Sequence, residues 1–501
     1  MGAFEAQAHA LLRRVLRARA SESWPHHLTM ARLVARALRS GRPAAVQAGS
    51  ATAQYRIGYL VPALLWPGPI ALVAPASIRE QLLRHEIPAL QQWLDAPKPV
   101  LTERPARSPT EEVLLRSPLS WLAECLSGER AAMPVIVDGA EDLERWARQQ
   151  LRAGIRPADW EALVRAYPNR AELIRATQAQ IERALARQAP RPSGARFVAP
   201  PEQAQLQALL QELASPVSAI VQPAFRQFGQ QWQASGELLW AQPEGEAFAL
   251  YCEPGSVAPT LSTIWQQQPF ALIGRYLDCD RNAANYRQQL GLGELTCVQF
   301  APQRQSELLQ LYCPPRLPRP NQPAFADCLL QELRYLVPLG DRSSGPTVVL
   351  IGDTPLRAQI GTQLAAEFGS RVRVDKTGEP PQGSSILVGD WAWWRSQRER
   401  VPPPMLAIAT LPLPSLEDPR AAAPVAYYKR HRQDWFRGYL LPNALRELQQ
   451  GVMPVRQAQG AVALLDSRAQ HRSYGRGVLA ALEPCASVSY IDALALASAG
   501  S

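Results

Sequence analysis

The feature that most constrains the fold is the alternation of short apolar runs with helical stretches, which occurs twice along the 501 residues. The first set of apolar runs covers residues 44–47, 70–76 and 134–138. The second set covers residues 347–351, 371–374, 385–388, 406–411 and 461–466. Strands that alternate with helices predict a parallel sheet with helices on both faces. Because 501 residues exceed one compact core, we predict two such α/β domains.

A proline-rich segment separates the two sets. Residues 311–323 contain five prolines, which is typical of a linker. We therefore predict a first domain over residues 1–320 and a second over 321–501.

The middle of the first domain has a different composition. Residues 142–235 are rich in Ala, Arg, Gln, Glu and Leu and carry few strand signals, so we predict a helical insertion there. Apolar runs of strand length resume at 247–252 and 270–274, and we expect them to continue the first domain.

Charge and cysteine content restrict the partners and the compartment. The net charge of +9 favours an anionic partner, nucleic acid first and a membrane surface second. The seven cysteines are odd in number and form no C-x-x-C pair, which argues against a disulfide framework or a zinc site. Arginines interrupt any signal-peptide core near the N-terminus, and no apolar run approaches 18 residues. We therefore expect a cytoplasmic protein with reduced thiols and no membrane segment.

The stretch from residue 44 to 65 has the layout of a phosphate-binding loop: an apolar run, a turn of small residues, then a helical segment. In the frame G-x-x-x-x-G-K-[ST], Ala48 and Ala53 stand at the glycines, Gln54 at the lysine and Tyr55 at the Ser/Thr position. A neutral amide in place of the lysine forgoes a charge-assisted hydrogen bond of about 1.5–3 kcal/mol. Taken alone, such a stretch is more often an ordinary strand-to-helix turn. The candidate nucleotide contacts are Gly49, Ser50, Thr52, Gln54, Tyr55 and Arg56.

Several motifs together indicate a family. Segments 48–55 and 58–64 correspond to "AGTGTGKS" and "AYLLPAL", and segment 135–141 lies where a D-E-A-H box is expected. The C-terminal motifs are at 411–419 ("LPF-x-x-P-x-D-P"), 435–444 ("F-x-x-Y-x-x-P-x-A"), 450–456 (motif VI), 464–468 ("LDxR") and 474–475 ("YG"). Over most of its length, the chain resembles the DinG/XPD branch of superfamily-two DNA helicases.

This resemblance implies two RecA-like (P-loop NTPase) parallel-sheet domains, with ATP and magnesium between them and DNA across both. Asp138 matches the magnesium-site aspartate, and Gly139 replaces the glutamate that activates water. Arg456 matches the final arginine of motif VI if one residue is deleted, and Pro454 replaces the first arginine. Loss of a general base costs about 10²–10⁴ in rate and loss of an arginine finger about 10³–10⁵, so we expect hydrolysis to be weak or absent.

Many members of the branch carry a four-cysteine iron–sulfur cluster between the first two ATP motifs. Only Cys125 lies between Gly49 and Asp138, so we expect no iron–sulfur cluster there.

Two segments of the second domain are candidates for contact with DNA. Trp391 and Trp393 precede Arg395, an arrangement that can stack bases and contact phosphate, although a tryptophan-rich stretch is more often packing. Lys429 and Arg430 begin a basic run on a predicted helix, which is more often a solvated face.

Three functional hypotheses follow. The leading one is a helicase-family pseudoenzyme that binds single-stranded or forked DNA and has a degenerate ATP site. The second is a working ATP-dependent DNA helicase, a hydrolase in which Arg56, Gln54 and Asp138 converge on the nucleotide. The third is a scaffold for an unidentified protein partner, with its basic residues scattered over the surface.

Overall fold

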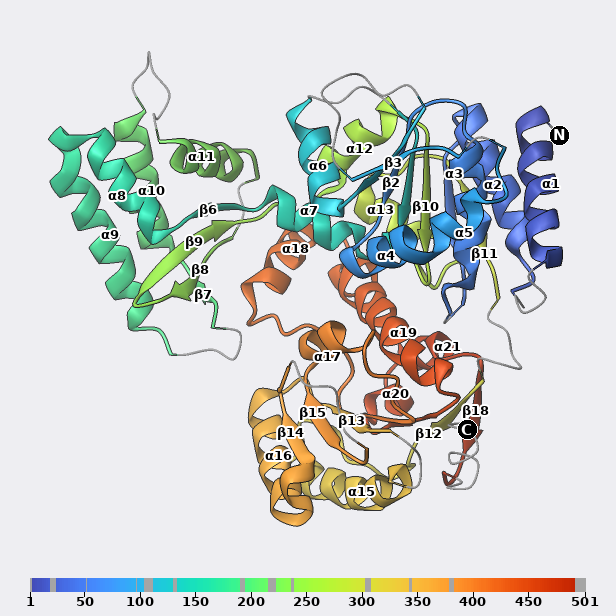
Figure 1. Cartoon of the computed structure of the whole chain (residues 1–501). Coiled ribbons are helices and arrows are strands. Elements are labelled where there is room, and N and C mark those ends of the chain that lie inside the picture. The colour runs from blue at the N-terminus through green and yellow to red at the C-terminus, as the bar shows by residue number, and fades with distance from the viewer. Residues whose placement is uncertain are drawn as a thin grey trace.

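The computed structural model describes residues 2–18, 24–50, 52–95, 97–102, 111–128, 133–189, 194–214, 222–235, 238–301, 308–341, 345–377 and 383–491. They form two α/β domains, each on a seven-stranded parallel sheet, and a smaller body inserted in the first domain (Figure 1). The predicted fold class of two RecA-like parallel-sheet domains is confirmed.

The sheet of domain 1 has the strand order β11-β1-β10-β5-β2-β4-β3. Its strands are β1 Ala44–Gln47, β2 Ile70–Val73, β3 Val100–Leu101, β4 Val113–Arg116, β5 Val135–Asp138, β10 Phe270–Gly274 and β11 Thr296–Gln299. Successive residues of a strand point to opposite faces, so Val46 belongs to one hydrophobic core and Ala45 to the other.

Helices cover both faces of this sheet (Figure 1). One face carries α1 Ala3–Ala18, α2 His27–Ser40, α3 Ile57–Leu65, α4 Ala76–Gln81, the π-helix η2 Leu82–Glu86 and α5 Ile87–Gln91. The other carries α6 Pro118–Ser127, α7 Leu143–Leu151, α12 Ala258–Gln267 and α13 Ala284–Leu290. This layering places the carboxyl ends of β1, β5 and β10 side by side, since those strands are parallel neighbours.

The insertion is not purely helical, which corrects the sequence prediction. Its helices are α8 Pro157–Ala166, α9 Ala171–Ala186, α10 Pro200–Leu213 and α11 Pro223–Ser235. They pack on an antiparallel sheet in the order β6-β9-β8-β7, formed by β6 Ala153–Ile155, β7 Arg196–Phe197, β8 Leu239–Glu244 and β9 Ala247–Cys252. The run at 247–252 therefore pairs with β8 in a hairpin through Gly245 (φ +63°) and does not join the first sheet. A turn at a positive-φ glycine makes this local pairing available.

Domain 2 begins earlier than predicted. Its sheet has the order β14-β15-β13-β16-β17-β12-β18. The strands are β12 Leu309–Tyr312, β13 Thr347–Leu350, β14 Val372–Val374, β15 Ile386–Gly389, β16 Met405–Ile408, β17 Ala461–Leu464 and β18 Cys485–Val488. β12 lies on the N-terminal side of the predicted boundary at 320, yet it pairs with both β17 and β18.

Helices also cover both faces of the second sheet. α15 Phe325–Gly340 and α16 Thr354–Phe368 pack on one face. α17 Trp391–Gln397, α19 Leu441–Gln457, α20 Arg468–His471 and α21 Gly475–Ala481 lie on the other. α18 Pro419–Arg430 extends from domain 2 toward α7 of domain 1 (Figure 1), followed by the π-helix η6 Phe436–Leu440.

In the part of the chain that the structure describes, no helix combines the length and apolar character that a membrane crossing requires.

Candidate functional site

The turn after β1 is packed against the rest of domain 1. The N–H groups of Ala48 and Gly49 donate to the carbonyl oxygens of Gly274 (2.8 Å) and Arg275 (3.3 Å). Gly49 has φ +59°, and a Cβ there would lie 2.1 Å from the carbonyl oxygen of Phe300. Glycine is thus required at 49 by the protein's own backbone, and two N–H groups at the start of the turn already have partners.

The polar side chains of the turn also bond locally. The hydroxyl oxygens of Ser50 and Thr52 are 3.1 Å apart, and the backbone N–H of Thr52 donates to Ser50 Oγ at 3.2 Å. Gln54 lies in the short 3₁₀ helix η1 Ala53–Arg56 and is half-buried. This 3₁₀ turn precedes α3 and directs the next two side chains into the domain.

The two residues that follow Gln54 meet Asp138 inside domain 1. The Tyr55 hydroxyl donates to Asp138 Oδ1 at 2.9 Å, and the Tyr59 hydroxyl donates to Oδ2 at 2.7 Å. Arg56 Nε lies 3.3 Å from Oδ2, and Arg56 Nη1 is 2.8 Å from Glu86 Oε1. We call Tyr55, Arg56, Tyr59 and Asp138 the Asp138 network.

The charges of the Asp138 network are balanced and hidden from water. Asp138 is fully buried, and Tyr55, Arg56 and Tyr59 are each at most 2% exposed. Burial, and then Asp138, raises the pKa of both tyrosines above the usual value, so the hydroxyls stay protonated and donate. Burial acts to lower the pKa of Arg56, but Asp138 and the tyrosines raise it overall, so the guanidinium stays charged.

Magnesium does not fit this arrangement. Oδ1 of Asp138 accepts from Tyr55 and from the N–H of Gly139 (2.9 Å), and Oδ2 accepts from Tyr59. A metal ion would have to displace a buried tyrosine, and the described residues contain no cluster of three or more His, Cys, Asp or Glu side chains able to hold a metal.

Aromatic rings close the side of the turn that faces α2. His26 stacks on Phe300 with centroids 4.6 Å apart, and Trp24 lies edge-on to Phe300 at 5.2 Å and to Tyr55 at 6.4 Å. His27 is the first residue of α2 and is buried, and burial followed by the charge of His26 lowers its pKa to about 4. His26 thus packs against Phe300, and His27 is the buried first residue of α2.

A cavity of about 1330 Å³ lies between domain 1, the base of the insertion and domain 2. Among its described lining residues are ten arginines and nine carboxylates. The arginines are Arg145, Arg148, Arg152, Arg319, Arg357, Arg395, Arg420, Arg446, Arg468 and Arg472. The carboxylates are Glu141, Asp142, Glu144, Glu253, Asp353, Asp390, Glu417, Asp418 and Glu447. Neither Asp138 nor the described turn residues 48–56 line this cavity.

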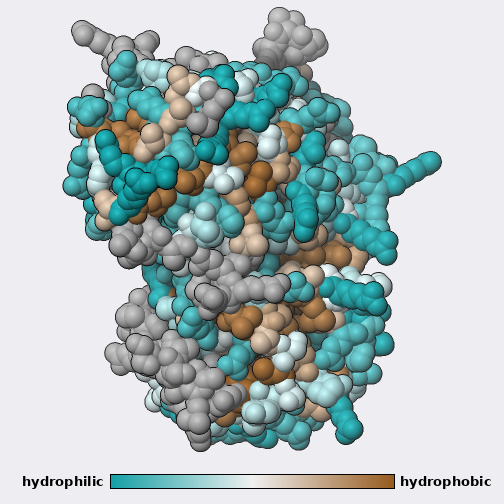
Figure 2. Space-filling model, turned by 90° about the vertical axis from the view of Figure 1, so that its right-hand side faces the viewer, coloured by the Kyte–Doolittle hydropathy of each residue, from teal (hydrophilic) through white to brown (hydrophobic). Residues whose placement is uncertain are grey.

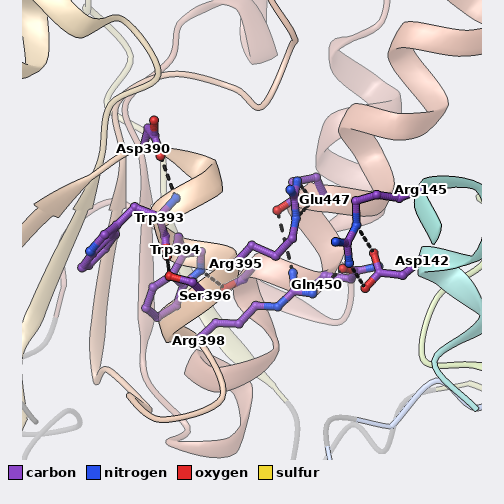
Figure 3. Close-up of polar contacts among 11 residues, drawn as sticks. Asp142, Arg145, Asp390, Trp393, Trp394, Arg395, Ser396, Arg398, Glu447 and Gln450 are labelled. Atoms are coloured by element: carbon purple, nitrogen blue, oxygen red, sulfur yellow. Dashed lines mark hydrogen bonds and ion pairs between the residues drawn. The ribbon is translucent and has the colours of Figure 1, made fainter. Parts of the chain in front are cut away.

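Charged side chains from both domains approach each other at this cavity. Figure 3 shows Asp142 and Arg145 of domain 1 directed toward α19, where Arg395 of α17 binds Glu447 at 2.6 Å. Burial acts to raise the pKa of Asp142, but Arg145 at 2.8 Å, and then Arg398 and Arg395 across the interface, hold it below its usual value. The two domains are therefore electrostatically coupled here.

Arg446 of α19 makes two hydrogen bonds across the domain interface. Its Nε donates to the carbonyl oxygen of Leu277 at 3.2 Å and its Nη2 to Gln289 Oε1 at 3.1 Å. Its guanidinium carbon also lies 5.5 Å from the ring centroid of Tyr286. Sequence reasoning missed Arg446, although its place in an amphipathic helix ahead of motif VI was readable.

Arg456, the residue aligned with motif VI, lies elsewhere. It is 1% exposed, its Nη1 donates to the carbonyl oxygen of Pro484 at 2.7 Å and its Nη2 to that of Leu482. These bonds tie the end of α19 to the segment before β18, and Arg456 does not line the interdomain cavity.

The tryptophans predicted to contact DNA belong to the core of domain 2. Trp391 and Trp393 are 7% and 8% exposed, and their indole N–H groups donate to the carbonyl oxygens of Thr410 and Lys376, both at 2.9 Å. Because both rings are buried, neither has a free face on which a base could stack. The two tryptophans therefore act as packing residues, the alternative given with the DNA-contact prediction. Arg395, in the same helix, does reach the cavity.

Lys429 and Arg430 are exposed at the end of α18. The ammonium of Lys429 lies 5.1 Å from the ring centroid of Trp435.

Glu141, at the histidine position of the D-E-A-H box, is expected to make stability fall as pH rises. Its Oε2 is buried without a hydrogen-bond partner, and burial followed by the charge of Asp142 raises its pKa to about 7 from 4.5. The folded state then keeps a proton that the unfolded chain loses between pH 4.5 and 7. Stability should therefore drop across that window, by up to about 3 kcal/mol at 1.36 kcal/mol per pKa unit.

Glu141→Gln should remove this loss and make the protein more stable than wild type at pH 8. Urea unfolding at pH 5 and pH 8 measures the effect, with the exposed Glu80→Gln as the matched control. Equal pH dependence of Glu141→Gln and wild type would contradict the prediction.

Comparisons with known proteins agree with this architecture. Residues 404–485 match the model of the helicase C-terminal domain. A solved structure named "XPD_Helicase" aligns with a TM-score of 0.61 and 9% identity, covering 93% of this chain and 100% of its own. The structure of S. tokodaii Xpd4 aligns with a TM-score of 0.59 and 11% identity, covering 92% and 99%. By sequence alone, no curated protein matches the chain.

These findings show a helicase C-terminal domain at residues 404–485 and, over most of the chain, the two-domain fold of the solved XPD structures. Both the domain match and the fold agree with the resemblance to XPD-type helicases that the motifs predicted.

Proposed function

We propose that this chain is a DNA-binding member of the helicase class whose ATP site has been replaced by internal packing. The observation that carries the proposal is the Asp138 network, in which the carboxylate expected to hold magnesium accepts hydrogen bonds from two buried tyrosines. A nucleotide would have to open this network and expose Arg56, which is also bound to Gln81 at 2.6 Å. Removing one partner from a buried ion pair costs about 3–5 kcal/mol, a large fraction of the binding energy that a nucleotide supplies.

The competing hypothesis of a rebuilt, working ATP site requires Gln54, Arg56 and Asp138 to converge on the nucleotide. Arg56 and Asp138 face each other inside the domain, away from the interdomain cavity where a nucleotide would meet domain 2. The packing therefore favours a protein without efficient ATP hydrolysis.

We place the proposed site for single-stranded or forked DNA at the interdomain cavity, which both domains line. Arg319 and Arg472 line it and are exposed, and in the described part of the chain neither guanidinium has a hydrogen-bonded partner. Arg395 adds a half-exposed guanidinium at the same cavity, and Lys429 and Arg430 extend the basic surface along α18. Arginine suits this role because its planar fork matches phosphate oxygens.

Two measurements on the full chain test the proposal. ATP hydrolysis with magnesium, with and without single-stranded DNA, should show no DNA-stimulated turnover. Turnover that falls in Gln54→Ala would contradict the proposal and establish a working helicase.

Binding of labelled single-stranded DNA should weaken steeply with salt. For about five phosphate contacts the expected slope of about −0.7 per contact lowers the affinity about 10²-fold between 50 and 200 mM salt.

Arg319→Gln/Arg472→Gln should weaken binding and lower the slope by about one unit. Arg316→Gln/Arg476→Gln, a pair of exposed arginines that do not line the cavity, is the matched control. A salt-independent affinity, or equal effects of the two pairs, would contradict binding in the cavity. Absence of DNA binding would favour the scaffold hypothesis instead.

A further inference from the structure

The net positive charge of this protein is concentrated in its first 43 residues, which include the helices α1 and α2. Residues 1–43 contain eight arginines and two glutamates, a net charge of +6 against +9 for the whole chain. Less than a tenth of the sequence thus carries two thirds of the net charge. None of the residues of α1 or α2 lines the interdomain cavity, so the proposed DNA site there does not use this charge.

The two helices form an antiparallel pair that brings the arginines together. Arg39, near the end of α2, binds Glu5, near the start of α1, at 2.7 Å. Burial, and then the charges of Arg32 and Arg13, lowers the pKa of His9. His9 is therefore within electrostatic range of one arginine from each helix.

The arginines of this surface are free to bind a ligand. Arg13, Arg17, Arg32 and Arg36 are exposed, and in the described part of the chain no carboxylate forms an ion pair with them. Arg14 is also exposed and donates to the carbonyl oxygen of Trp93 at 2.9 Å. We call Arg13, Arg14, Arg17, Arg32 and Arg36 the α1 arginine face.

A shallow groove of about 640 Å³ accompanies the α1 arginine face. His9, Arg13, Arg14 and Arg17 line one side of it, and Trp93 lines the other. The guanidinium carbon of Arg14 lies 5.9 Å from the ring centroid of Trp93, which is half-buried. The groove therefore combines the guanidinium groups of Arg13 and Arg17, which have no ion pair among the described residues, with one partly exposed aromatic ring.

We propose that the α1 arginine face is a second nucleic-acid site that binds the phosphate backbone. Arg13 and Arg17 are one helical turn apart, about 6 Å along the axis, and a duplex strand carries one charge per 3.4 Å, so each can contact its own phosphate. The ring of Trp93 adds a surface on which a base or sugar packs. An acidic protein could pair with the arginines but has no base to stack on the Trp93 ring. Arginines beside a partly exposed aromatic ring therefore favour a nucleic acid as the ligand.

The α1 arginine face is well separated from the cavity. In Figure 1, α1 lies at the edge of domain 1 opposite the insertion, and the cavity is lined by α7 and domain 2. Figure 2 views the molecule from the side on which α1 lies, and hydrophilic side chains cover much of the upper body there. A strand or duplex arm that leaves the cavity would thus have a second point of attachment.

The test compares two variants that remove the same charge. Arg13→Gln/Arg14→Gln/Arg17→Gln alters the α1 arginine face, and Arg175→Gln/Arg183→Gln/Arg187→Gln alters exposed arginines of the outer helix α9 and its C-cap. Labelled single-stranded, duplex and forked DNA are titrated at several salt concentrations.

The α1 variant should lower the slope of log affinity against log salt by about two units, which corresponds to an affinity loss of about 10- to 50-fold at 0.15 M salt. Equal results for the two variants would overturn the proposal. Arg13→Gln/Arg17→Gln, which removes no hydrogen bond or ion pair among the described residues, keeps the test valid if the triple variant does not fold.

Further measurements separate this proposal from the DNA site in the cavity. If Arg319→Gln/Arg472→Gln weakens binding and the α1 variant does not, the cavity site stands and the second site fails. The reverse result supports the second site and rejects the cavity. Photocrosslinking of 5-iodouracil DNA should label peptides containing α1 or Trp93, and labelling confined to the cavity would overturn the proposal. Binding to anionic vesicles that falls in the α1 variant while DNA binding does not would identify a membrane contact and overturn it as well.

Discussion

Asp138→Ala is expected to lower the free energy of unfolding of domain 1 by about 3–5 kcal/mol. The substitution removes the fully buried carboxylate that lies 3.3 Å from Arg56 Nε and leaves the buried guanidinium only the partly exposed Glu86, 2.8 Å from Nη1, as an ion-pair partner. It also removes the acceptor of two buried tyrosine hydroxyls, each of which then loses a hydrogen bond to a charged group. Urea denaturation followed by circular dichroism measures the change.

The matched control is Asp95→Ala, because Asp95 is an exposed aspartate of the same domain and should change stability by less than about 0.5 kcal/mol. Tyr59→Phe should cost about 1.5–3 kcal/mol in wild type and much less in Asp138→Ala, since its partner is then absent. Additive effects of the two substitutions, or a wild-type-like Asp138→Ala, would contradict the network.

This result bears on how enzyme assays are interpreted. If an aspartate only bound magnesium, its substitution would be expected to abolish turnover without lowering stability. In this protein the same substitution should destabilise domain 1, so any loss of activity would not by itself assign a catalytic role to Asp138.

Arg446→Ala is expected to weaken the contact between the domains by about 3 kcal/mol. The substitution removes two hydrogen bonds of a charged group to Leu277 and Gln289, worth about 1.5–3 kcal/mol each in a buried setting, and the contact with Tyr286. Small-angle scattering should show a larger radius of gyration, and thermal unfolding should separate into two transitions.

Arg446→Lys keeps the charge without the fork of donors and should fall between wild type and Arg446→Ala. The control is Arg437→Ala, because Arg437 is exposed and its nearest carboxylate, Asp434, is 4.0 Å away. An unchanged radius of gyration and a single transition in Arg446→Ala would show that other contacts hold the domains together.

The parallel sheets were predictable because strands buried on both faces are continuous apolar runs, as in β5 and β13. The sheet of the insertion was not, because β7 has two residues and β8 ends in exposed polar positions. β12 was missed for a different reason, since the prolines that follow it made the whole segment resemble a linker.

For the candidate site, the sequence identified the positions but not their contacts. Tyr55 and Asp138 are 83 residues apart, and only the parallel pairing of β1, β10 and β5 brings their segments together. Tyr59 was overlooked, although its spacing of four residues from Tyr55 places both on one side of a helical segment. Arg456 was predicted as a site residue from its alignment with motif VI, but its side chain bonds to the segment before β18 and does not line the cavity. Alignment with a motif does not determine where a long side chain points.

The way the insertion is attached has a consequence for the architecture as a whole. The paired residues Ala153 and Cys252 are the first and last of its strands, and next to them Arg152 Nε lies 2.5 Å from Glu253 Oε1. The polypeptide therefore leaves domain 1 and returns to it at adjacent points, and no strand of the insertion belongs to the seven-stranded sheet. The insertion is joined to domain 1 by two adjacent chain segments. A change in the length or sequence of the insertion would therefore leave the strand register of the seven-stranded sheet unaltered.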